Sequence, residues 1–328
     1  MSAASWRTAD GRFVRGRARA GNRRLVFAIS LTEVPSSETS LKFMAAKIES
    51  IQFQGIDALQ LRTPDGASAV ISLYGAQVLS WIPAGGEEWL FLSERARFDR
   101  QSAVRGGIPV CFPQFSGLGD LPKHGFARTH TWQVASQQTD DAYAMVTLEL
   151  SDDAQTRQLW PHAFKAEITL LIAEDRLDLE LGVENTGEES ISFTAALHTY
   201  LRVREVEESV LEGLYGHQYR DAAKGNAIAK DSGPTLQVNA ELDRVYHGVE
   251  RPLLLRDGKR SLGINAEGFP DVVVWNPWEQ ASAKLSDMTP TAFRRMLCVE
   301  AAAARNQVTV TPGEEWWGRQ TLVAMQSE

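Results

Sequence analysis

Apolar and polar residues alternate in short runs through most of this 328-residue chain, and this two-residue period limits the fold more than any other feature. Residues 176–184 give the clearest example, because they read RLDLELGVE with leucine or valine at most second positions. Such alternation places the apolar side chains on one face of a β-strand. Turn signals such as Pro64-Asp65-Gly66 separate the runs. The pattern therefore predicts many short strands and little helix.

The runs continue from Lys47 to the end of the chain, and only residues 153–159 favour a short helical turn. More than a dozen strands joined by turns are typical of an all-β fold, either an antiparallel sandwich or a barrel. We find no internal repeat and no linker after residue 44, which favours one domain over residues 44–328. The predicted strands are residues 69–73, 78–82, 88–92, 131–135, 144–150, 164–173, 176–184, 190–203, 251–256, 259–265, 271–275, 294–299, 308–310 and 319–324.

Residues 1–43 differ from the rest, because they are rich in arginine and contain one acidic residue, Asp10, among the first 32 positions. Three interpretations are open: a disordered basic arm, a targeting peptide, or a translated extension upstream of a start at Met44. The apolar stretch 25–31 is short for a secretory signal, and no clear cleavage pattern follows it. We expect a basic, disordered N-terminal extension outside the fold.

Composition excludes several classes of protein. The net charge of −8 argues against nucleic acid as the main partner. No apolar run approaches the ~18 residues that a membrane helix needs. The two cysteines, Cys111 and Cys298, suggest no disulfide framework and fit a reducing, cytoplasmic compartment. Each is expected to be a small buried residue rather than a nucleophile.

One stretch, residues 104–128, carries an unusual set of groups and reads VRGGIPVCFPQFSGLGDLPKHGFAR. Its glycines and prolines exclude a regular helix and favour a stiff loop that holds side chains still. Its polar groups are mostly basic, which is an anion-binding signature inside an acidic chain. A long surface loop with solvated charges is the simpler interpretation, and composition alone leaves both open. The polar groups are Arg105, Gln114, Lys123, His124 and Arg128.

Two ionisable residues stand out by their setting in predicted strands. In residues 190–203 one face is apolar, which leaves His198 on a mixed second face that points to water or into a cleft. Glu300 follows the apolar run 296–299, and alternation puts it on the face of Cys298, where desolvation would raise the pKa of its carboxyl. The simpler alternatives are an exposed strand histidine and a glutamate at the solvent rim of a strand end.

Other motifs either support sugar chemistry or exclude other chemistry. Trp275 and Trp278 lie near a strand end, where an aromatic ring can stack on a sugar, although most such tryptophans pack in the core. The chain has no Cys/His metal spacing, P-loop, dinucleotide fingerprint or Gly-x-Ser-x-Gly elbow. A metal site, an oxidoreductase, a kinase or a serine hydrolase is therefore unsupported.

Six motifs, in their order and spacing, resemble the hexose-phosphate mutarotases, also called glucose-6-phosphate 1-epimerases, of the aldose 1-epimerase superfamily. The resemblance spans about residues 46–324 and implies a large antiparallel β-sandwich of the galactose mutarotase-like type. The motifs are RGGIPVCFP at 105–113, LPKHGFAR at 121–128, LHTYLR at 197–202, DRVY at 243–246, VWNPW at 274–278 and CVE at 298–300.

The resemblance implies an isomerase that interconverts the α and β anomers of a hexose 6-phosphate, with glucose 6-phosphate as the expected substrate. It implies no cofactor and a small-molecule phosphosugar as the partner, and we expect a monomer. Alternatives are an aldose 1-epimerase acting on unphosphorylated hexoses, a non-catalytic carbohydrate-binding β-sandwich, and a glycoside hydrolase with Asp243 as its second carboxylate. The implied residues are His198 and Glu300 for catalysis, and Arg105, Lys123, His124, Arg128 and Asp243 for substrate binding.

Anomer exchange requires residues of these types. Opening the ring takes a proton from the C1 hydroxyl and gives one to the ring oxygen, and closing the ring reverses both transfers. We expect Glu300 to act as the base on the C1 hydroxyl and His198, as an imidazolium, to act as the acid on the ring oxygen. Guanidinium groups hold phosphate bidentately, so Arg105 and Arg128, with Lys123 between them, would favour a phosphosugar over a free sugar.

Overall fold

The computed structural model describes residues 5–7, 13–15 and 45–325, and the chain divides into two compact units, residues 1–43 and 44–328. In the first unit β1 (Ser5–Arg7) pairs with β2 (Phe13–Arg15) in an antiparallel sheet. The predicted disorder of residues 1–43 otherwise falls outside the described residues. Among those residues, we find no helix with the length and apolar character required to cross a membrane.

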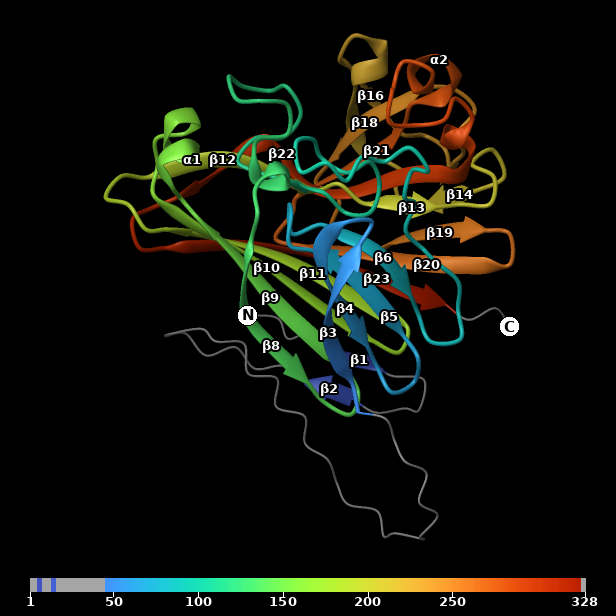
Figure 1. The fold of residues 1–328 in the computed structure, drawn as a ribbon. Coiled ribbons are helices and arrows are strands. Elements are labelled where there is room, and N and C mark those ends of the chain that lie inside the picture. The colour runs from blue at the N-terminus through green and yellow to red at the C-terminus, as the bar shows by residue number, and fades with distance from the viewer. Residues whose placement is uncertain (1–4, 8–12, 16–44, 326–328) are drawn as a thin grey trace, which may run out of the picture. The chain divides into compact units, whose positions relative to one another are not determined.

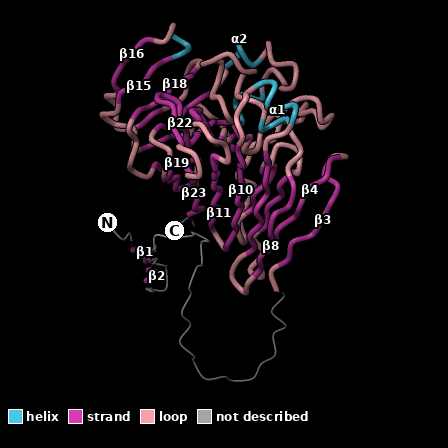
Figure 2. The backbone as a smooth tube through the Cα atoms, turned by 90° about the vertical axis from the view of Figure 1, so that its left-hand side faces the viewer, coloured by secondary structure: helices cyan, strands magenta, loops and turns pink. Residues whose placement is uncertain are grey.

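The second unit is built almost entirely of antiparallel strands, and Figure 2 shows how little helix it contains. Its α-helices are α1 (Ala154–Leu159) and α2 (Trp278–Ser282). α1 lies where the sequence predicts a helical turn, and the Asp153 carboxylate caps it by accepting hydrogen bonds from the N–H groups of Gln155 and Thr156. The rest of the unit follows the two-residue period.

Three sheets make up the second unit, and in Figure 1 β10, β11 and β23 run side by side in the largest. The nine-stranded sheet has the order β17 (Thr235–Leu236), β14 (Val210–Glu212), β19 (Leu253–Asp257), β20 (Arg260–Glu267), β23 (Glu315–Met325), β11 (Arg176–Asn185), β10 (Phe164–Ala173), β9 (Ala144–Ser151) and β8 (Gln133–Thr139). The eight-stranded sheet has the order β16 (Ala227–Lys230), β15 (Gln218–Asp221), β18 (Leu242–His247), β21 (Asp271–Asn276), β22 (Met296–Val310), β12 (Ile191–Leu197) and β7 (Val110–Cys111), with β13 (Tyr200–Arg202) also beside β22. The four-stranded sheet has the order β3 (Lys47–Phe53), β4 (Ile56–Arg62), β5 (Ser68–Ser72) and β6 (Val78–Ile82).

One hydrophobic core joins the three sheets. Leu181 of the nine-stranded sheet, Val299 of the eight-stranded sheet and Ile71 of the four-stranded sheet are all buried in the same cluster. Each comes from the inward face of its strand, as the alternation requires. The predicted all-β antiparallel sandwich is confirmed.

Two strand predictions are wrong in an informative way. Residues 190–203 do not form one strand, because pairing stops after Leu197 and resumes at Tyr200, which leaves His198 and Thr199 between β12 and β13. The longest strand is instead β22, which joins the predicted strands 294–299 and 308–310.

A third predicted strand, residues 88–92, forms only isolated bridges, at Leu90 and Leu92. The Glu88 carboxylate explains the difference, because its Oε1 accepts hydrogen bonds from the backbone N–H groups of Trp81 and Leu90, each at 2.8 Å. A side chain thus takes the place that a strand partner would fill. The sequence also gave no separate prediction for β3, β4 and β14 to β18, several of which are short or largely exposed.

Candidate active site

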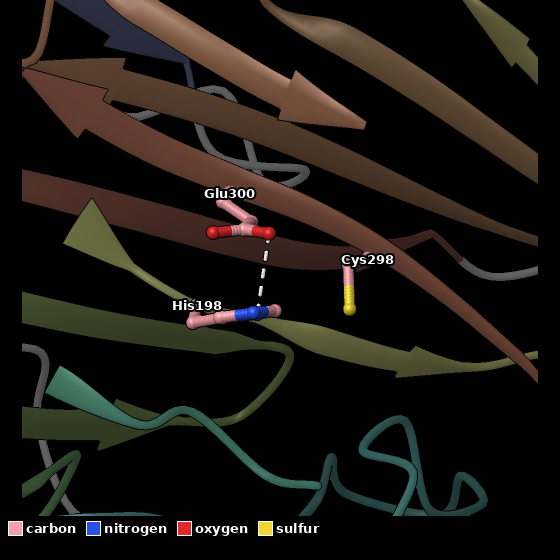
Figure 3. Close-up of side chains that lie close together, drawn as sticks. All are labelled: His198, Cys298 and Glu300. Atoms are coloured by element: carbon pink, nitrogen blue, oxygen red, sulfur yellow. Dashed lines mark ion pairs between the residues drawn. The ribbon is translucent and has the colours of Figure 1, made fainter. Parts of the chain in front are cut away.

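His198 and Glu300 face each other across neighbouring strands of the eight-stranded sheet. The end of β12 and the whole of β13 pair with β22 in one register, with Leu197 opposite Ala301 and Tyr200 opposite Cys298, and this register sets His198 opposite Glu300. The two side chains point toward each other, with Nδ1 of His198 3.2 Å from Oε1 of Glu300 (Figure 3). Both are buried, at 7% and 1% exposure. The two predicted catalytic residues therefore lie together.

Asp243 lies on the same face of this sheet, two strands from β22. Asp243 on β18 pairs with Trp275 on β21, which in turn pairs with Cys298 on β22. Because paired residues of neighbouring strands point to the same side of a sheet, Asp243 belongs to the row next to Glu300. Burial, and after it the negative charge of Asp243, raises the pKa of the Glu300 carboxyl.

Aromatic rings fix the imidazole of His198 in place. The ring stacks on Tyr200 with centroids 4.7 Å apart and an interplanar angle of 11°. Trp275 meets the same imidazole edge-on at 6.0 Å, and the ring of His124 lies 5.3 Å away. Trp275 thus contributes to the site, whereas Trp278 packs on Phe293.

Arg105 reaches the site because two glycines allow its loop to pass against other strands. Gly106 and Gly107 have φ values of +114° and +60°, and a Cβ on either would approach a backbone carbonyl to 2.3 or 2.1 Å. Nε and Nη2 of Arg105 each lie 3.1 Å from Oδ2 of Asp287, and Nη1 donates to the Tyr200 hydroxyl at 2.9 Å. Asp287 therefore offsets part of the positive charge of Arg105.

His124 is a buried residue with a left-handed backbone, at φ +67°, on the predicted anion-binding loop. Its Nδ1 accepts a hydrogen bond from the Ser116 N–H at 3.3 Å and lies 3.1 Å from Sγ of Cys111. Because an N–H group donates to Nδ1, the neutral ring carries its proton on Nε2. Burial, with help from nearby cations, lowers the pKa of His124 to about 3, so the ring stays neutral at physiological pH.

The other two cations of this loop lie at the site as well. Nη2 of Arg128 donates to the backbone carbonyl of Lys123 at 2.7 Å, which ties the two residues together. Burial has the largest effect on the pKa values of His198 and Glu300. The positive charges of Lys123 and Arg128 add to the lowering of the His198 pKa and partly offset the rise of the Glu300 pKa. In the part of the chain that the structure describes, neither forms an ion pair with a carboxylate.

Burial shifts the pKa values of the facing pair in opposite directions. It raises the pKa of the Glu300 carboxyl and lowers the pKa of the His198 imidazole, because both charged forms lose solvation. In this structure the neutral forms are therefore favoured, with the proton on the carboxyl, and the expected imidazolium is not the favoured form. Within the described ranges, His198 Nδ1 and Glu300 Oε2 have no aligned hydrogen-bond partner, which is uncommon for buried polar atoms and suits a polar ligand.

The pair also belongs to a set of potential metal donors. Among the described residues, a nitrogen of His198, Sγ of Cys298 and a carboxylate oxygen of Glu300 lie within 4.8 Å of one another. Nitrogen, sulfur and oxygen donors suit Zn²⁺. However, burial raises the pKa of the Cys298 thiol, and the positive charges around the set oppose a further cation. The donors alone do not establish a metal site.

Comparison with known proteins decides the family. The family model for aldose 1-epimerase matches residues 57–322 of this chain. The chain belongs to the aldose 1-epimerase family. Its curated relatives include proteins named as candidate glucose-6-phosphate 1-epimerases, from Cenchrus ciliaris at 36% identity over 83% of this chain and 86% of that protein, and from Escherichia coli K12 at 32% over 87% and 93%.

Solved structures agree with this aldose 1-epimerase family assignment. A candidate mutarotase from Salmonella typhimurium superposes with a TM-score of 0.79 at 28% identity, covering 89% of this chain and 97% of that one. A galactose 1-epimerase from Lactobacillus acidophilus has a TM-score of 0.68 at 16% identity, covering 86% and 100%, and supports the fold alone. The galactose mutarotase-like β-sandwich and the assignment to the epimerases are confirmed.

Sequence reasoning missed part of the site. Tyr200 supports both His198 and Arg105, and alternation already puts it on the face of His198. Cys298 lies beside the pair, as its shared face with Glu300 indicates. No sequence pattern predicted Asp287 as part of the site, because it lies in an irregular segment 182 positions from Arg105.

Proposed function

We propose that this epimerase interconverts the α and β anomers of a hexose 6-phosphate, with glucose 6-phosphate as the substrate. The observation that carries the proposal is the contact between His198 and Glu300 beside two cations, Lys123 and Arg128, that form no ion pair with a carboxylate among the described residues. The names of the curated relatives support the same substrate.

The chemistry needs one transferable proton on the pair. In the proposed reaction the Glu300 carboxylate takes the proton of the C1 hydroxyl while His198 gives a proton to the ring oxygen. The bond between C1 and the ring oxygen then breaks and an aldehyde forms at C1. After rotation about the C1–C2 bond the ring oxygen attacks the other face of the aldehyde, and both protons return. Such transfers each contribute about 10²–10⁴-fold.

Burial favours the other tautomer of the same pair, with the proton on Glu300 and a neutral His198. The two tautomers hold the same number of protons, and the 3.2 Å separation lets one convert to the other by a single transfer. We propose that the polar groups of the sugar stabilise the charge-separated form as they replace water around the pair. Asp243 and the Nε2–H of His124 are proposed to bind ring hydroxyls.

The phosphate is proposed to bind Lys123 and Arg128 rather than Arg105. Asp287 already offsets the charge of Arg105, whose remaining N–H groups suit a neutral sugar oxygen. Lys123 and Arg128 are tied together and together supply two positive charges to a phosphate dianion. This refines the expectation that Arg105 and Arg128 share the phosphate.

Exchange between the two anomers, followed by ¹H NMR saturation transfer at equilibrium, tests the proposal. We expect fast exchange for glucose 6-phosphate, much slower exchange for glucose, and a loss of about 10²-fold or more for Glu300→Gln and for His198→Asn. The exposed Glu49→Gln is the matched control and should match the wild type. Equal rates for both sugars would favour an epimerase of unphosphorylated hexoses. Full activity of Glu300→Gln would overturn the catalytic role of Glu300, and no acceleration of anomer exchange by the wild type would favour a carbohydrate-binding protein. A phosphosugar substrate and two free, buried cysteines also lead us to propose a cytoplasmic location.

A further inference from the structure

The backbone turns away from its ladder at His198. The N–H of Thr199 donates at 2.9 Å to the carbonyl of Leu197, two residues back, and so closes a three-residue turn centred on His198. In an unbroken antiparallel pair Thr199 and Val299, which lie opposite each other, would exchange two hydrogen bonds. Only one remains, from the Val299 N–H to the Thr199 carbonyl at 3.1 Å. The turn therefore leaves the Val299 carbonyl without its donor from the strand.

A side chain from the other sheet supplies the missing donor. Nε2 of Gln320 donates to the Val299 carbonyl at 3.0 Å, and Oε1 of Gln320 accepts a hydrogen bond from the Thr199 hydroxyl. Gln320 lies on β23, where Leu179 and Ala266 are its strand partners. Because a carbonyl oxygen cannot donate, these two contacts also fix which end of the amide faces which strand.

The two polar side chains occupy the dry core of the sandwich. Thr199 is fully buried and Gln320 is 2% exposed, although their strands otherwise turn mostly apolar residues to this side. A buried polar group costs free energy unless it is hydrogen-bonded, so leucine and valine at these positions would fit the core more simply. One of these hydrogen bonds acts on the peptide unit that joins Val299 to Glu300. The other holds the side chain of Thr199, the residue that follows His198.

We propose that Gln320 and Thr199 are positioning residues for the epimerase reaction, holding the peptide of Glu300 and the turn at His198 so that the two side chains face each other. The inference rests on the proposed function, since it assumes that this pair transfers the protons. Neither residue touches the sugar in this proposal, because both lie on the core side of the sheet. Their loss should lower kcat and leave KM for glucose 6-phosphate nearly unchanged.

The substitutions that test this role are chosen to keep the volume of the side chains they replace. Gln320→Leu and Thr199→Val remove the hydrogen bonds while keeping the volume, whereas Thr199→Ser keeps the hydroxyl and should restore activity. Leucine is preferred to alanine, because a cavity of about 10 Å³ lined by Val299, Glu300 and Gln320 already adjoins the site, and a larger space would admit water as a substitute donor. Misplacement of reacting groups by about 1 Å costs up to about 10²-fold, so we expect kcat to fall about 10- to 100-fold.

A second buried amide gives the matched control. Asn185 is also fully buried and donates to two backbone carbonyls, those of Glu189 and Val310, away from the site. Asn185→Leu should therefore lower the denaturant midpoint as Gln320→Leu does and leave kcat at the wild-type value. The double variant Thr199→Val with Gln320→Leu should be no slower than the slower single variant, because the two residues act through one network.

The outcomes separate this inference from the proposed function. Wild-type kcat for Gln320→Leu, a rise in KM that accounts for its defect, or an equal fall in kcat for Asn185→Leu would each overturn the positioning role. If Gln320→Leu does not fold, the comparison of Thr199→Val with Thr199→Ser decides by the same criterion. No acceleration of anomer exchange by the wild type would instead overturn the proposed function, and full activity of Glu300→Gln would overturn its catalytic pair, whatever the result for Gln320.

Discussion

Nδ1 of His198 lies 3.2 Å from Oε1 of Glu300, although the two residues are 102 positions apart in the sequence and the strand that should carry the histidine breaks beside it. At this separation the two groups titrate as a pair rather than as independent sites. The pair is buried against Tyr200 and Trp275, and in the proposed mechanism its active form holds one proton. Its pH dependence is therefore a direct readout of the geometry.

We predict a bell-shaped pH profile for kcat, with its plateau between the lowered pKa of His198 and the raised pKa of Glu300. Burial lowers the pKa of His198 below its ordinary 6.5, so the pair takes up a second, inactivating proton only on the acid side of that value. Burial raises the pKa of Glu300 above its ordinary 4.5, so the pair loses its working proton only as the pH rises beyond that raised value. NMR saturation transfer over a pH series measures the profile.

The control for this profile is a substrate without a titrating phosphate, because a phosphate ester has its own pKa near ~6. Glucose 6-sulfate keeps the negative charge and does not titrate in this range. An acid limb that begins above neutral pH with both substrates would contradict the buried, neutral histidine.

His124 should make the protein sensitive to acid. Its pKa is lowered to about 3 in the folded state, against about 6.5 in the unfolded chain, so the unfolded state binds a proton first as the pH falls. The free energy of unfolding therefore falls as the pH drops below about 6.5, by up to about 1.4 kcal/mol per pH unit from this histidine. Urea unfolding measures the free energy of unfolding of the wild type and of His124→Asn. Between neutral pH and about pH 5, we expect the wild type to lose about 2 kcal/mol relative to the variant.

The partly buried His217 provides the comparison, as His217→Asn removes a histidine that lies outside the site. A pH-independent gap between wild type and His124→Asn would mean that His124 is not held neutral by the fold.

Alternation predicted the faces of the strands better than their ends. In residues 190–203 it assigned Leu197 and Leu201 to the core and His198 to the opposite side, and this division persists across the break. The break itself was not predictable locally, because no glycine or proline occurs there and the group that stabilises it, Gln320, is 121 positions away from Thr199. The signal that the sequence offered for this break was the presence of polar residues at positions where alternation places apolar ones.

Glu300 illustrates the same limit. Its desolvation was predicted in the correct direction, but it lies within β22 rather than at a strand end, because the small apolar residues 301–304 continue the strand. Arg105 was predicted to bind the phosphate, and its partner Asp287 could be found only from the fold. Long-range partners of charged groups follow from packing, which a single sequence does not encode in any local pattern.

We predict that removal of metal ions leaves the activity intact. Lys123, Arg128 and Arg105 each act on His198 to disfavour positive charge, which opposes a cation among the donors of His198, Cys298 and Glu300. After dialysis against a chelator, anomer exchange of glucose 6-phosphate should stay within about twofold of the starting rate. Loss of activity that added Zn²⁺ restores would instead identify the three donors as a working metal site.

Lys123 should decide between phosphorylated and free sugars. It is exposed, forms no ion pair with a carboxylate among the described residues, and acts with Arg128 on the pair. Replacing it by methionine removes one charge-assisted contact to the phosphate, so KM for glucose 6-phosphate should rise about tenfold. KM for glucose should stay the same, because glucose has no phosphate that Lys123 could contact. The exposed Lys47→Met on β3 is the matched control. Added salt should reduce the difference in KM between the variant and the wild type, since salt screens the charge of Lys123 that only the wild type has. An equal rise in KM for both sugars would assign Lys123 to the sugar ring instead of the phosphate.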